Sequence, residues 1–161
     1  MNGISYFETK SGNLISKRCL IKGSDHIQIS GRTIIQDKII VRGDLAIIAL
    51  GKYPSYKKHN GKIKYIQMEI GDFVFVEKNT IISASKIGSY TRIGKDCIIG
   101  HRVVIAENVI IADGTIIPPD SVIPAYSIYG GKLKLNYLYF SLFLNYITSY
   151  FDIFYSKLTK I

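Results

Sequence analysis

The stretch VEKNTIISASKIGSYTRIGKDCIIGHRVVIAENVIIADGTIIPPDSVIPAYSIYGG, residues 76–131, decides the fold of this chain. An aliphatic residue returns every six positions along it, with one five-residue step between Ile82 and Ile87. The next residue is usually Gly, Ala or Pro, and the fourth residue after it is usually Val, Thr, Ser or Cys. Neither the 3.6-residue period of a helix nor the two-residue alternation of a strand explains this spacing. The stretch is therefore a hexapeptide repeat.

Each position of the repeat has a physical role. The aliphatic residue fills an interior layer, the small residue fits inside a narrow corner, and β-branched residues suit the short straight pieces. Asn, Asp and Gly tolerate the left-handed backbone of a sharp turn, and they stand three residues after the aliphatic position at Asn79, Asp96, Asn108, Gly114 and Asp120. Six residues therefore give one strand and one corner, and three such units close a triangular coil of about 18 residues.

The repeat predicts an all-β solenoid of about five coils, with strands stacked in parallel around a column of Ile and Val. The residues expected inside include Ile87, Ile93, Ile99, Ile105, Ile111 and Ile117. An ordinary β-sandwich would place its turns every 8–12 residues and would lose this phase. Ile29, Ile35 and Val41 join the same phase, so we expect the solenoid over residues 1–131.

A basic segment interrupts the repeat after Gly51. Residues 51–69 are too long for one hexad and are expected to protrude from a corner as a loop. This loop is either simply solvated or in contact with an acidic protein surface. Nucleic acid is not the expected partner, because the only aromatic residues beside the lysines are Tyr53, Tyr56 and Tyr65. The candidate partner contacts are Lys52, Lys57, Lys58, Lys62 and Lys64.

The tail, residues 132–161, is expected to form an amphipathic helix. The uncharged stretch 135–151 is short and contains two asparagines, so no transmembrane segment is expected. The apolar face is expected either to cover a flank of the solenoid or to dock on a partner or a membrane surface. Apolar residues recur there at three- and four-residue spacing: Phe140, Leu144, Ile147, Phe151, Phe154, Leu158 and Ile161.

Composition limits the classes of protein. The chain has 161 residues, 47% hydrophobic and 20% charged, which suits one domain with a substantial core. Two cysteines, Cys19 and Cys97, cannot build a disulfide framework or a four-ligand zinc site. The N-terminus lacks a basic region followed by an apolar run, so the sequence predicts an intracellular protein. The net charge of +9 favours acidic partners without naming one.

The hexapeptide pattern resembles the left-handed parallel β-helix family, and this resemblance implies the hand of the coil. VRGDLA at residues 41–46, with IIQD and IGH, resembles the γ-class carbonic anhydrases, whose trimers hold zinc with three histidines from two chains. The resemblance places one ligand at His101 and a second where this chain has Ala106; the region of the third contains His59, in no recognisable ligand context. One histidine cannot replace three ligands, so no metal, no cofactor and no zinc hydration chemistry are expected.

Two further sets of residues could belong to an enzyme: His101, and the pair Arg42 and Asp44. Hexapeptide acyltransferases, also trimeric, use a histidine as general base, and His101 is the candidate base if the chain is an enzyme. No clear orienting partner accompanies it in the sequence, so a surface or corner residue is the expectation. Arg42 and Asp44 correspond to an ion pair near the subunit interface of the carbonic anhydrases. Without the zinc ligands, they are expected to hold a backbone turn or a neighbouring chain.

The N-terminal sequence resembles the dynactin subunit 5 family more closely. The motifs are YFETKSGN at residues 6–13, GSDHIQISGRTI at residues 23–34 and IIVRGDLA at residues 39–46. Residues 70–100 and 118–131 fit the same pattern, so the resemblance covers residues 6–131. The loop after Gly51 and the tail from Lys132 depart from the family.

The resemblance implies a non-enzymatic adaptor in the cytoplasm, associated with the cytoskeleton. It would bind a dynactin subunit 6-like β-helix and other subunits at the pointed end of dynactin, where that complex helps cytoplasmic dynein engage cargo adaptors. We expect residues 6–19 to cap one end of the rod and the other end to meet the partner. The alternative is a free homotrimer, as in the γ-class carbonic anhydrases and the acyltransferases.

Overall fold

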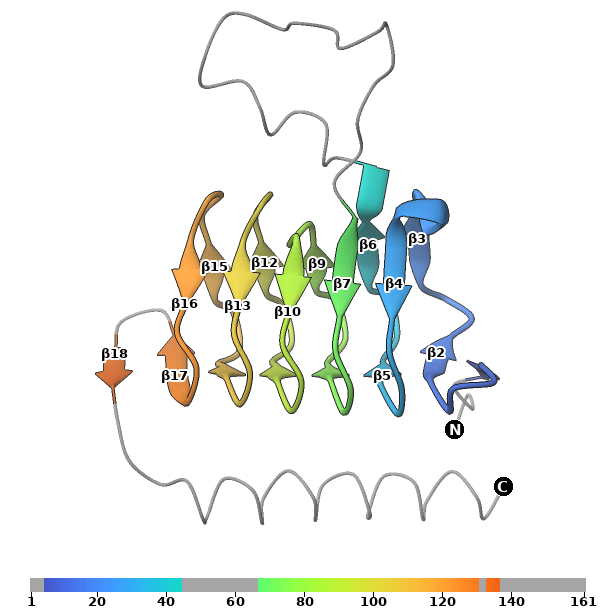
Figure 1. Ribbon diagram of the computed structural model, residues 1–161, viewed down its shortest axis with the longest axis horizontal. Helices are drawn as coiled ribbons and strands as arrows, with labels where there is room; N and C mark the ends of the chain where they lie inside the picture. The colour runs from blue at the N-terminus through green and yellow to red at the C-terminus, as the bar shows by residue number, and fades with distance from the viewer. Residues whose placement is uncertain (1–4, 45–66, 131–132, 137–161) are drawn as a thin grey trace, which may run out of the picture.

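The computed structural model describes residues 5–44, 67–130 and 133–136, which form a three-sided parallel β-solenoid (Figure 1). In this view the chain advances from right to left. Each turn passes from the lower sheet to the rear sheet, then to the front sheet, and so back to the lower one. A path that turns in this sense as it advances is left-handed, which confirms the expected fold.

The three sheets are named A, B and C in the order in which the chain visits them. Sheet A contains β1 (Tyr6–Glu8), β2 (Leu14–Ser16), β5 (Ile34–Ile35), β8 (Phe75–Val76), β11 (Arg92–Ile93), β14 (Ile110–Ile111), β17 (Ser127–Gly130) and β18 (Leu133–Asn136). Sheet B contains β3 (Leu20–Lys22), β6 (Ile40–Arg42), β9 (Ile81–Ile82), β12 (Ile98–Ile99) and β15 (Ile116–Ile117). Sheet C contains β4 (Ile27–Ile29), β7 (Met68–Ile70), β10 (Lys86–Ile87), β13 (Val104–Ile105) and β16 (Val122–Ile123). A 3-10 turn, η1 (Ser24–His26), joins β3 to β4.

The hexad residues form the core, as the sequence predicts. Identical positions of successive coils pair in register, so that Ile99 lies between Ile82 and Ile117 in parallel sheet B. Each layer of the column therefore rests on the next, and burial of this apolar surface is the main stabilising term. The six predicted interior residues are at most 1% exposed: Ile87, Ile93, Ile99, Ile105, Ile111 and Ile117.

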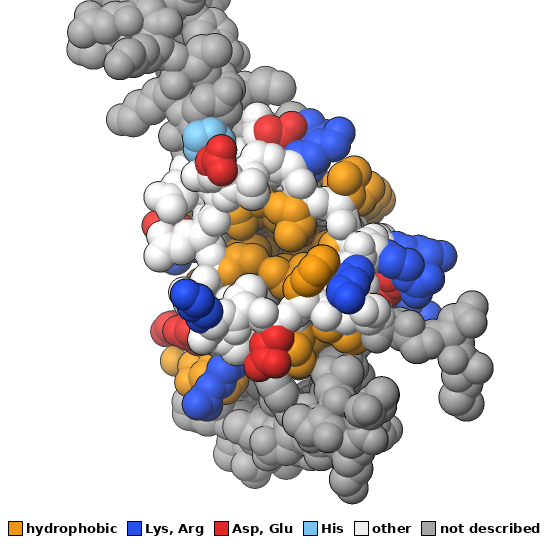
Figure 2. Space-filling model, turned by 90° about the vertical axis from the view of Figure 1, so that its right-hand side faces the viewer, with side chains coloured by type: hydrophobic (Ala, Val, Ile, Leu, Met, Phe, Trp, Pro, Cys, Tyr) orange, Lys and Arg blue, Asp and Glu red, His pale blue; other side chains and the backbone are white. Residues whose placement is uncertain are grey.

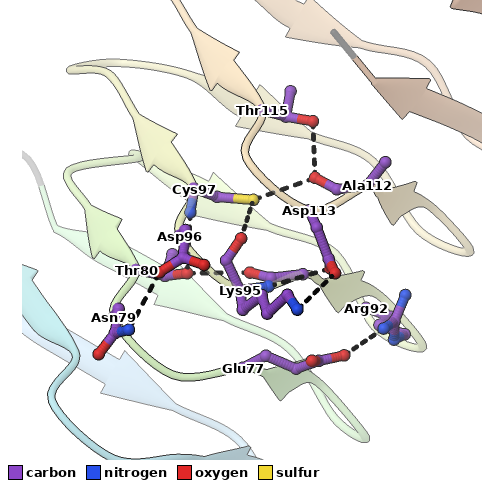
Figure 3. Close-up of polar contacts among 11 residues, drawn as sticks. Glu77, Asn79, Thr80, Arg92, Lys95, Asp96, Cys97, Ala112, Asp113 and Thr115 are labelled. Carbon is purple, nitrogen blue, oxygen red and sulfur yellow. Dashed lines mark hydrogen bonds and ion pairs between the residues drawn. The ribbon is translucent and has the colours of Figure 1, made fainter.

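The residue four positions after an interior aliphatic residue turns into the corner, and where it is Thr or Cys it can bond a backbone carbonyl (Figure 3). Thr80 Oγ1 donates to the carbonyl oxygen of Gly94 at 2.9 Å. Cys97 Sγ and Thr115 Oγ1 both donate to the carbonyl oxygen of Ala112, at 3.1 and 2.6 Å. These three side chains are at most 1% exposed, so the hydrogen bonds offset the cost of burying polar groups.

The corners adopt the left-handed backbone that the repeat predicts. The φ angles lie between 55° and 66° at Asn79, Asp96, Asn108, Gly114 and Asp120. The corner at the five-residue step, residues 83–85, has no residue with positive φ. The amides of Ser85 and Lys86 instead share the carbonyl oxygen of Val103, at 3.0 and 3.3 Å. The missing residue therefore removes the left-handed position and leaves a tighter turn.

Two boundaries differ from the expected ones. β7 (Met68–Ile70) belongs to sheet C, so the solenoid resumes before the end of the expected loop at residue 69. β18 (Leu133–Asn136) pairs antiparallel with β17, at the place where the sequence predicts the start of a helix. In both cases an apolar-polar alternation within a short segment can extend a sheet. The remainder of the expected loop and helix lies outside the described residues.

The part of the chain described here contains no helix long and apolar enough to cross a membrane.

Candidate protein-binding surface

The N-terminal segment extends one sheet, and no described strand covers the end edges of the other two sheets. β1 pairs antiparallel with β2 in a hairpin, where the amide of Thr9 donates to the carbonyl oxygen of Asn13 at 3.0 Å. Because β1 continues the plane of sheet A, the three-residue strand does not reach across the triangular end. β3 and β4 are therefore the outermost strands of sheets B and C. Residues 6–16 thus extend sheet A at this end, and the expected cap over residues 6–19 stays a prediction.

The interior layer of the first coil is only partly covered. Its isoleucines each have a register partner in the second coil that is at most 2% exposed. Figure 2 looks at this end and shows hydrophobic side chains gathered at its centre, inside a ring of backbone and charged groups. The end is thus a core layer without the next coil on top. The partly buried residues are Ile15, Cys19, Ile21, Ile27 and Ile29.

The last coil differs from the first. Its interior residues Ile117 and Ile123 are 1% and 3% exposed. Sheet A is extended there by β18, which pairs antiparallel with β17. Among the described residues, the apolar interior is therefore less covered at the N-terminal end, where a cap is expected from the sequence.

A small polar cluster borders the open end. Arg18 Nε donates to Asp37 Oδ1 at 2.7 Å, and Ser16 Oγ donates to the same oxygen at 3.2 Å. Burial, and next the negative charge of Asp37, raise the pKa of the Tyr6 hydroxyl. Because Asp37 is buried and bonded to both partners, this cluster fixes the first corner beside the open layer.

Cys19 lies inside the first coil, next to this cluster. Its Sγ donates to the carbonyl oxygen of Gln36 at 2.8 Å. Burial is the largest cause of a raised pKa for the thiol. A thiol that stays protonated is a weak nucleophile and a poor metal ligand, so Cys19 acts as a small apolar residue of the open layer.

Arg42 and Asp44 form an ion pair at the next corner. Arg42 Nε and Nη2 donate to the two carboxylate oxygens of Asp44, at 2.7 and 3.0 Å. These hydrogen bonds hold the pKa of the Asp44 carboxyl below its usual value. A Cβ added to Gly23 would lie 2.6 Å from the Asp44 amide nitrogen, so the neighbouring coil needs glycine there. The pair closes a turn within the chain, and an additional interface role stays a prediction.

His101 stands at the corner that follows β12, and Ala106 follows five residues later. The His101 Nδ1 atom is buried and makes no hydrogen bond with the described protein. A cavity of about 10 Å³ adjoins it, lined in part by Ser83, Ser85 and Arg102, which is room for about one water molecule. Within residues 5–44, 67–130 and 133–136, no three His, Cys, Asp or Glu side chains cluster as metal ligands would.

The five lysines predicted as partner contacts fall outside the described residues. They are Lys52, Lys57, Lys58, Lys62 and Lys64. The surface that the structure brings together is instead the open first coil, which sequence reasoning missed. The sequence feature that indicates this surface is the start of the repeat, in the hexads before Ile35. The first coil of a solenoid has no earlier coil to cover its interior residues.

The chain is similar to a known protein family, to a curated relative and to a solved structure. The sequence model of the family described as Dynactin subunit 5 matches residues 1–158. A curated relative, dynactin subunit 5 of Dictyostelium discoideum, is 42% identical over 94 residues, which is 52% of this chain and 48% of the relative. The chain thus spans about half the length of that relative. A solved hexapeptide transferase family protein from Anaplasma phagocytophilum aligns over 86% of this chain and 88% of its own, with 15% identity and a TM-score of 0.44.

Proposed function

This chain belongs to the dynactin subunit 5 family, and we propose that it is a non-enzymatic subunit of dynactin that binds a second β-solenoid through its open N-terminal end. The partner would be a dynactin subunit 6-like protein. The complex would be cytoplasmic and associated with the cytoskeleton, and at the pointed end it would help cytoplasmic dynein engage cargo adaptors. No cofactor takes part.

The observation that carries this proposal is the uncovered interior layer of the first coil. Ile21 and Ile27 are partly exposed, whereas their register partners Val41 and Met68 are 1% and 2% exposed. Burying this layer against another apolar surface would be favourable by about 25 cal/mol per Å². Proteins do not usually leave such a layer in water, so a partner is a simple explanation.

The backbone at the same end supports a β-solenoid as the partner. β3 and β4 are edge strands, with one row of peptide groups that no described strand pairs. An incoming strand can add to such an edge by main-chain hydrogen bonds. A second solenoid would offer an edge and an apolar layer together, and would continue both the sheets and the core.

The direct test is assembly with a subunit 6-like β-helix protein from the same organism. We expect the full chain to form a complex on co-expression, measured by size-exclusion chromatography with light scattering. Ile21→Asp should weaken it by at least about tenfold, since it places a charge in the buried contact. The matched control is Ile128→Asp, at a 49% exposed residue of the last coil.

Circular dichroism checks that both variants fold. Equal binding by Ile21→Asp and wild type would reject end docking. A stable self-trimer that excludes the partner would favour the homotrimer instead. Recovery of actin-related protein and other dynactin components by affinity purification from the native organism would support the wider role in dynein transport.

A further inference from the structure

The last coil of the solenoid is rich in proline. The chain has four prolines, and three of them stand in this coil: Pro118, Pro119 and Pro124. Pro118 directly follows β15 of sheet B, and Pro124 directly follows β16 of sheet C. These two strands are the last of their sheets, as Figure 1 shows. Both prolines therefore lie at the edge where a further coil would stack.

In the earlier coils of sheet C, the residue at the place of Pro124 joins one coil to the next. The backbone amide of this residue donates to the carbonyl oxygen of the interior isoleucine one coil further on, at 2.8–3.0 Å. The residues that hold this place in successive coils are Ser30, Gly71, Gly88 and Ala106. Proline has no amide hydrogen, so this series of bonds ends at the last coil.

Sheet B ends in the same way. The Ser83 amide donates to the carbonyl oxygen of Ile99 at 3.0 Å. One coil further on, the Gly100 amide donates to the carbonyl oxygen of Ile117 at 2.9 Å. Pro118 takes the equivalent place in the last coil. In sheet A the last parallel strand, β17, is instead covered by the antiparallel β18. Each of the three sheets thus finishes with a feature that interrupts the parallel repeat.

A proline at this place removes a hydrogen bond and also adds bulk. Its ring carbon replaces the amide hydrogen and points toward the carbonyl oxygen that a further coil would bring. For this reason, prolines within sheets are found at edge strands and at strand ends, and not in central strands. Proline is one of the means by which proteins keep an exposed strand edge from pairing with another chain.

The N-terminal end lacks these prolines. β3 and β4 are the outermost strands of sheets B and C there, and the first proline of the sequence is Pro54. The peptide groups along the outer edges of these two strands can therefore pair with an added strand. A solenoid that could stack at both ends would also join head to tail with copies of itself, and such contacts give open filaments. A block at one end prevents this.

We propose that Pro118 and Pro124 end the solenoid, because they block any further coil from stacking on sheets B and C of the last coil. Neither a second copy of the chain nor another β-solenoid can then continue the stack at this end. The chain stands at the end of its assembly, with a β-solenoid partner on its N-terminal side. The statement about this partner rests on the proposed function, whereas the block is a property of the chain itself.

The block can be tested by adding one coil to the chain. A copy of residues 95–112 is inserted either before Asp113, which leaves the prolines in the last coil, or after Gly130, which places them inside the solenoid. Both insertions have the same sequence and keep the phase of the repeat. We expect the insertion after Gly130 to unfold at a urea midpoint lower by at least about 0.5 M, because hydrogen bonds between two coils are lost.

Substitutions then identify the prolines as the cause. Pro118→Gly with Pro124→Ala restores the residues of the preceding coil. This pair should recover most of the lost midpoint in the chain extended after Gly130, and it should not raise the midpoint of the unextended chain. Pro119→Ala is the matched control and should recover nothing, because the equivalent His101 amide donates to no described carbonyl of the next coil. Equal midpoints for the two insertions, or equal recovery with Pro119→Ala, would overturn the proposal.

The stoichiometry of the complex tests the statement about the partner. Native mass spectrometry of the unmodified chain with an excess of the subunit 6-like β-solenoid should show one partner per chain, and none with Ile21→Asp. A second partner that remains bound to the Ile21→Asp chain would mean stacking on the last coil and would overturn the inference. Absence of any complex would reject the proposed function, while the two insertions would still decide whether the prolines block a further coil.

Discussion

Ile15 and Ile35 occupy the same interior position in successive coils, paired in parallel between β2 and β5, but only Ile35 is fully buried. Both side chains belong to the same apolar column, and the difference is that no further coil of the described chain covers Ile15. A solenoid propagates its fold by stacking, so each new coil would gain the same contacts as the last. An uncovered first layer is therefore a place where stacking can continue with another molecule.

A charged side chain should destabilise the fold by very different amounts at the two adjacent isoleucines of β12. Ile99 is 1% exposed in the core, whereas Ile98 is 43% exposed on the outer face. Ile99→Asp should destabilise the fold by several kcal/mol, because a buried unpaired carboxylate must be desolvated. Ile98→Asp should change the free energy of unfolding by about 1 kcal/mol at most. Urea unfolding followed by circular dichroism measures both, and a fully folded Ile99→Asp protein would contradict the coil assignment.

Replacement of two corner glycines by alanine should destabilise the fold for different reasons. A Cβ on Gly88 would lie 2.4 Å from the Glu107 amide nitrogen, so Gly88→Ala forces two coils apart and should cost about 1–3 kcal/mol. Gly114 has open space around its Cβ position but a φ of 66°, so Gly114→Ala should cost only about 1 kcal/mol.

Gly114→Asn is the matched control for that comparison. Asn79 and Asn108 hold the equivalent place in other coils with φ of 61° and 55°, so this variant should be close to neutral. The measurement is the unfolding midpoint of each variant. A smaller loss for Gly88→Ala than for Gly114→Ala would contradict the packing described here.

Much of the fold follows from the sequence because the repeat encodes each position separately. The hexad places the interior isoleucines, and Asn, Asp and Gly mark part of the left-handed corners. Arg32, Phe73 and Tyr90 also have positive φ, between 52° and 57°, although their residue types do not favour it. Closure of the coil imposes the left-handed backbone at these positions. Their side chains also stack: the ring centroids of Phe73 and Tyr90 are 5.1 Å apart with an interplanar angle of 7°, and the Arg32 guanidinium lies over the Phe73 ring.

The candidate surfaces are harder to predict from sequence. The hexads of the first coil read like interior ones, because exposure depends on whether another coil lies above them. The outward aliphatic row of sheet B becomes visible only when every third hexad is compared, since Ile81, Ile98 and Ile116 each precede an interior isoleucine. Arg42, Asp44 and His101 are positions that the sequence does indicate, and their environment is what the structure adds.

The Cys19 thiol should report on the open end. Cys97 is fully buried, so N-ethylmaleimide should modify Cys19 first in the native chain. Thiolate is the reactive form, and the raised pKa of Cys19 means that the rate should still be rising above pH about 8.5, the usual pKa of a free thiol. Mass spectrometry of timed samples gives the rate. Addition of the β-solenoid partner should slow it, and equal rates with and without partner would contradict docking at this end.

The basic segment offers a test that is separate from the fold. Lys57 and Lys58 fall outside the described residues, and the sequence gives them no acidic neighbour before Glu69. Lys57→Glu with Lys58→Glu should leave the unfolding midpoint within about 1 °C, because exposed charges contribute little to stability. The double variant should weaken binding to an acidic partner surface and lower its salt dependence. Unchanged binding would mean that the loop is only solvated.

The last prediction concerns the outer face of sheet A. Leu14, Ile34 and Phe75 pair in register, and each is followed by a residue that packs in the core or against it, so the three point outward. They are nevertheless 8%, 0% and 3% exposed. Residues 137–161 have the apolar spacing of an amphipathic helix and are long enough to lie along this face. We therefore expect this segment to cover the three side chains.

Removal of residues 137–161 should then expose an apolar strip. Each of the three side chains would lose about 1.5–3 kcal/mol of burial, so the truncated chain should unfold at lower urea and bind more of the dye ANS. The untruncated chain with Leu144→Ser and Phe151→Ser should show the same changes, and one with Thr148→Ser should not, because Thr148 falls on the polar side of the expected helix. An unchanged unfolding midpoint and dye signal after truncation would instead assign the segment to a partner or a membrane surface, since its apolar face would then be free of the solenoid.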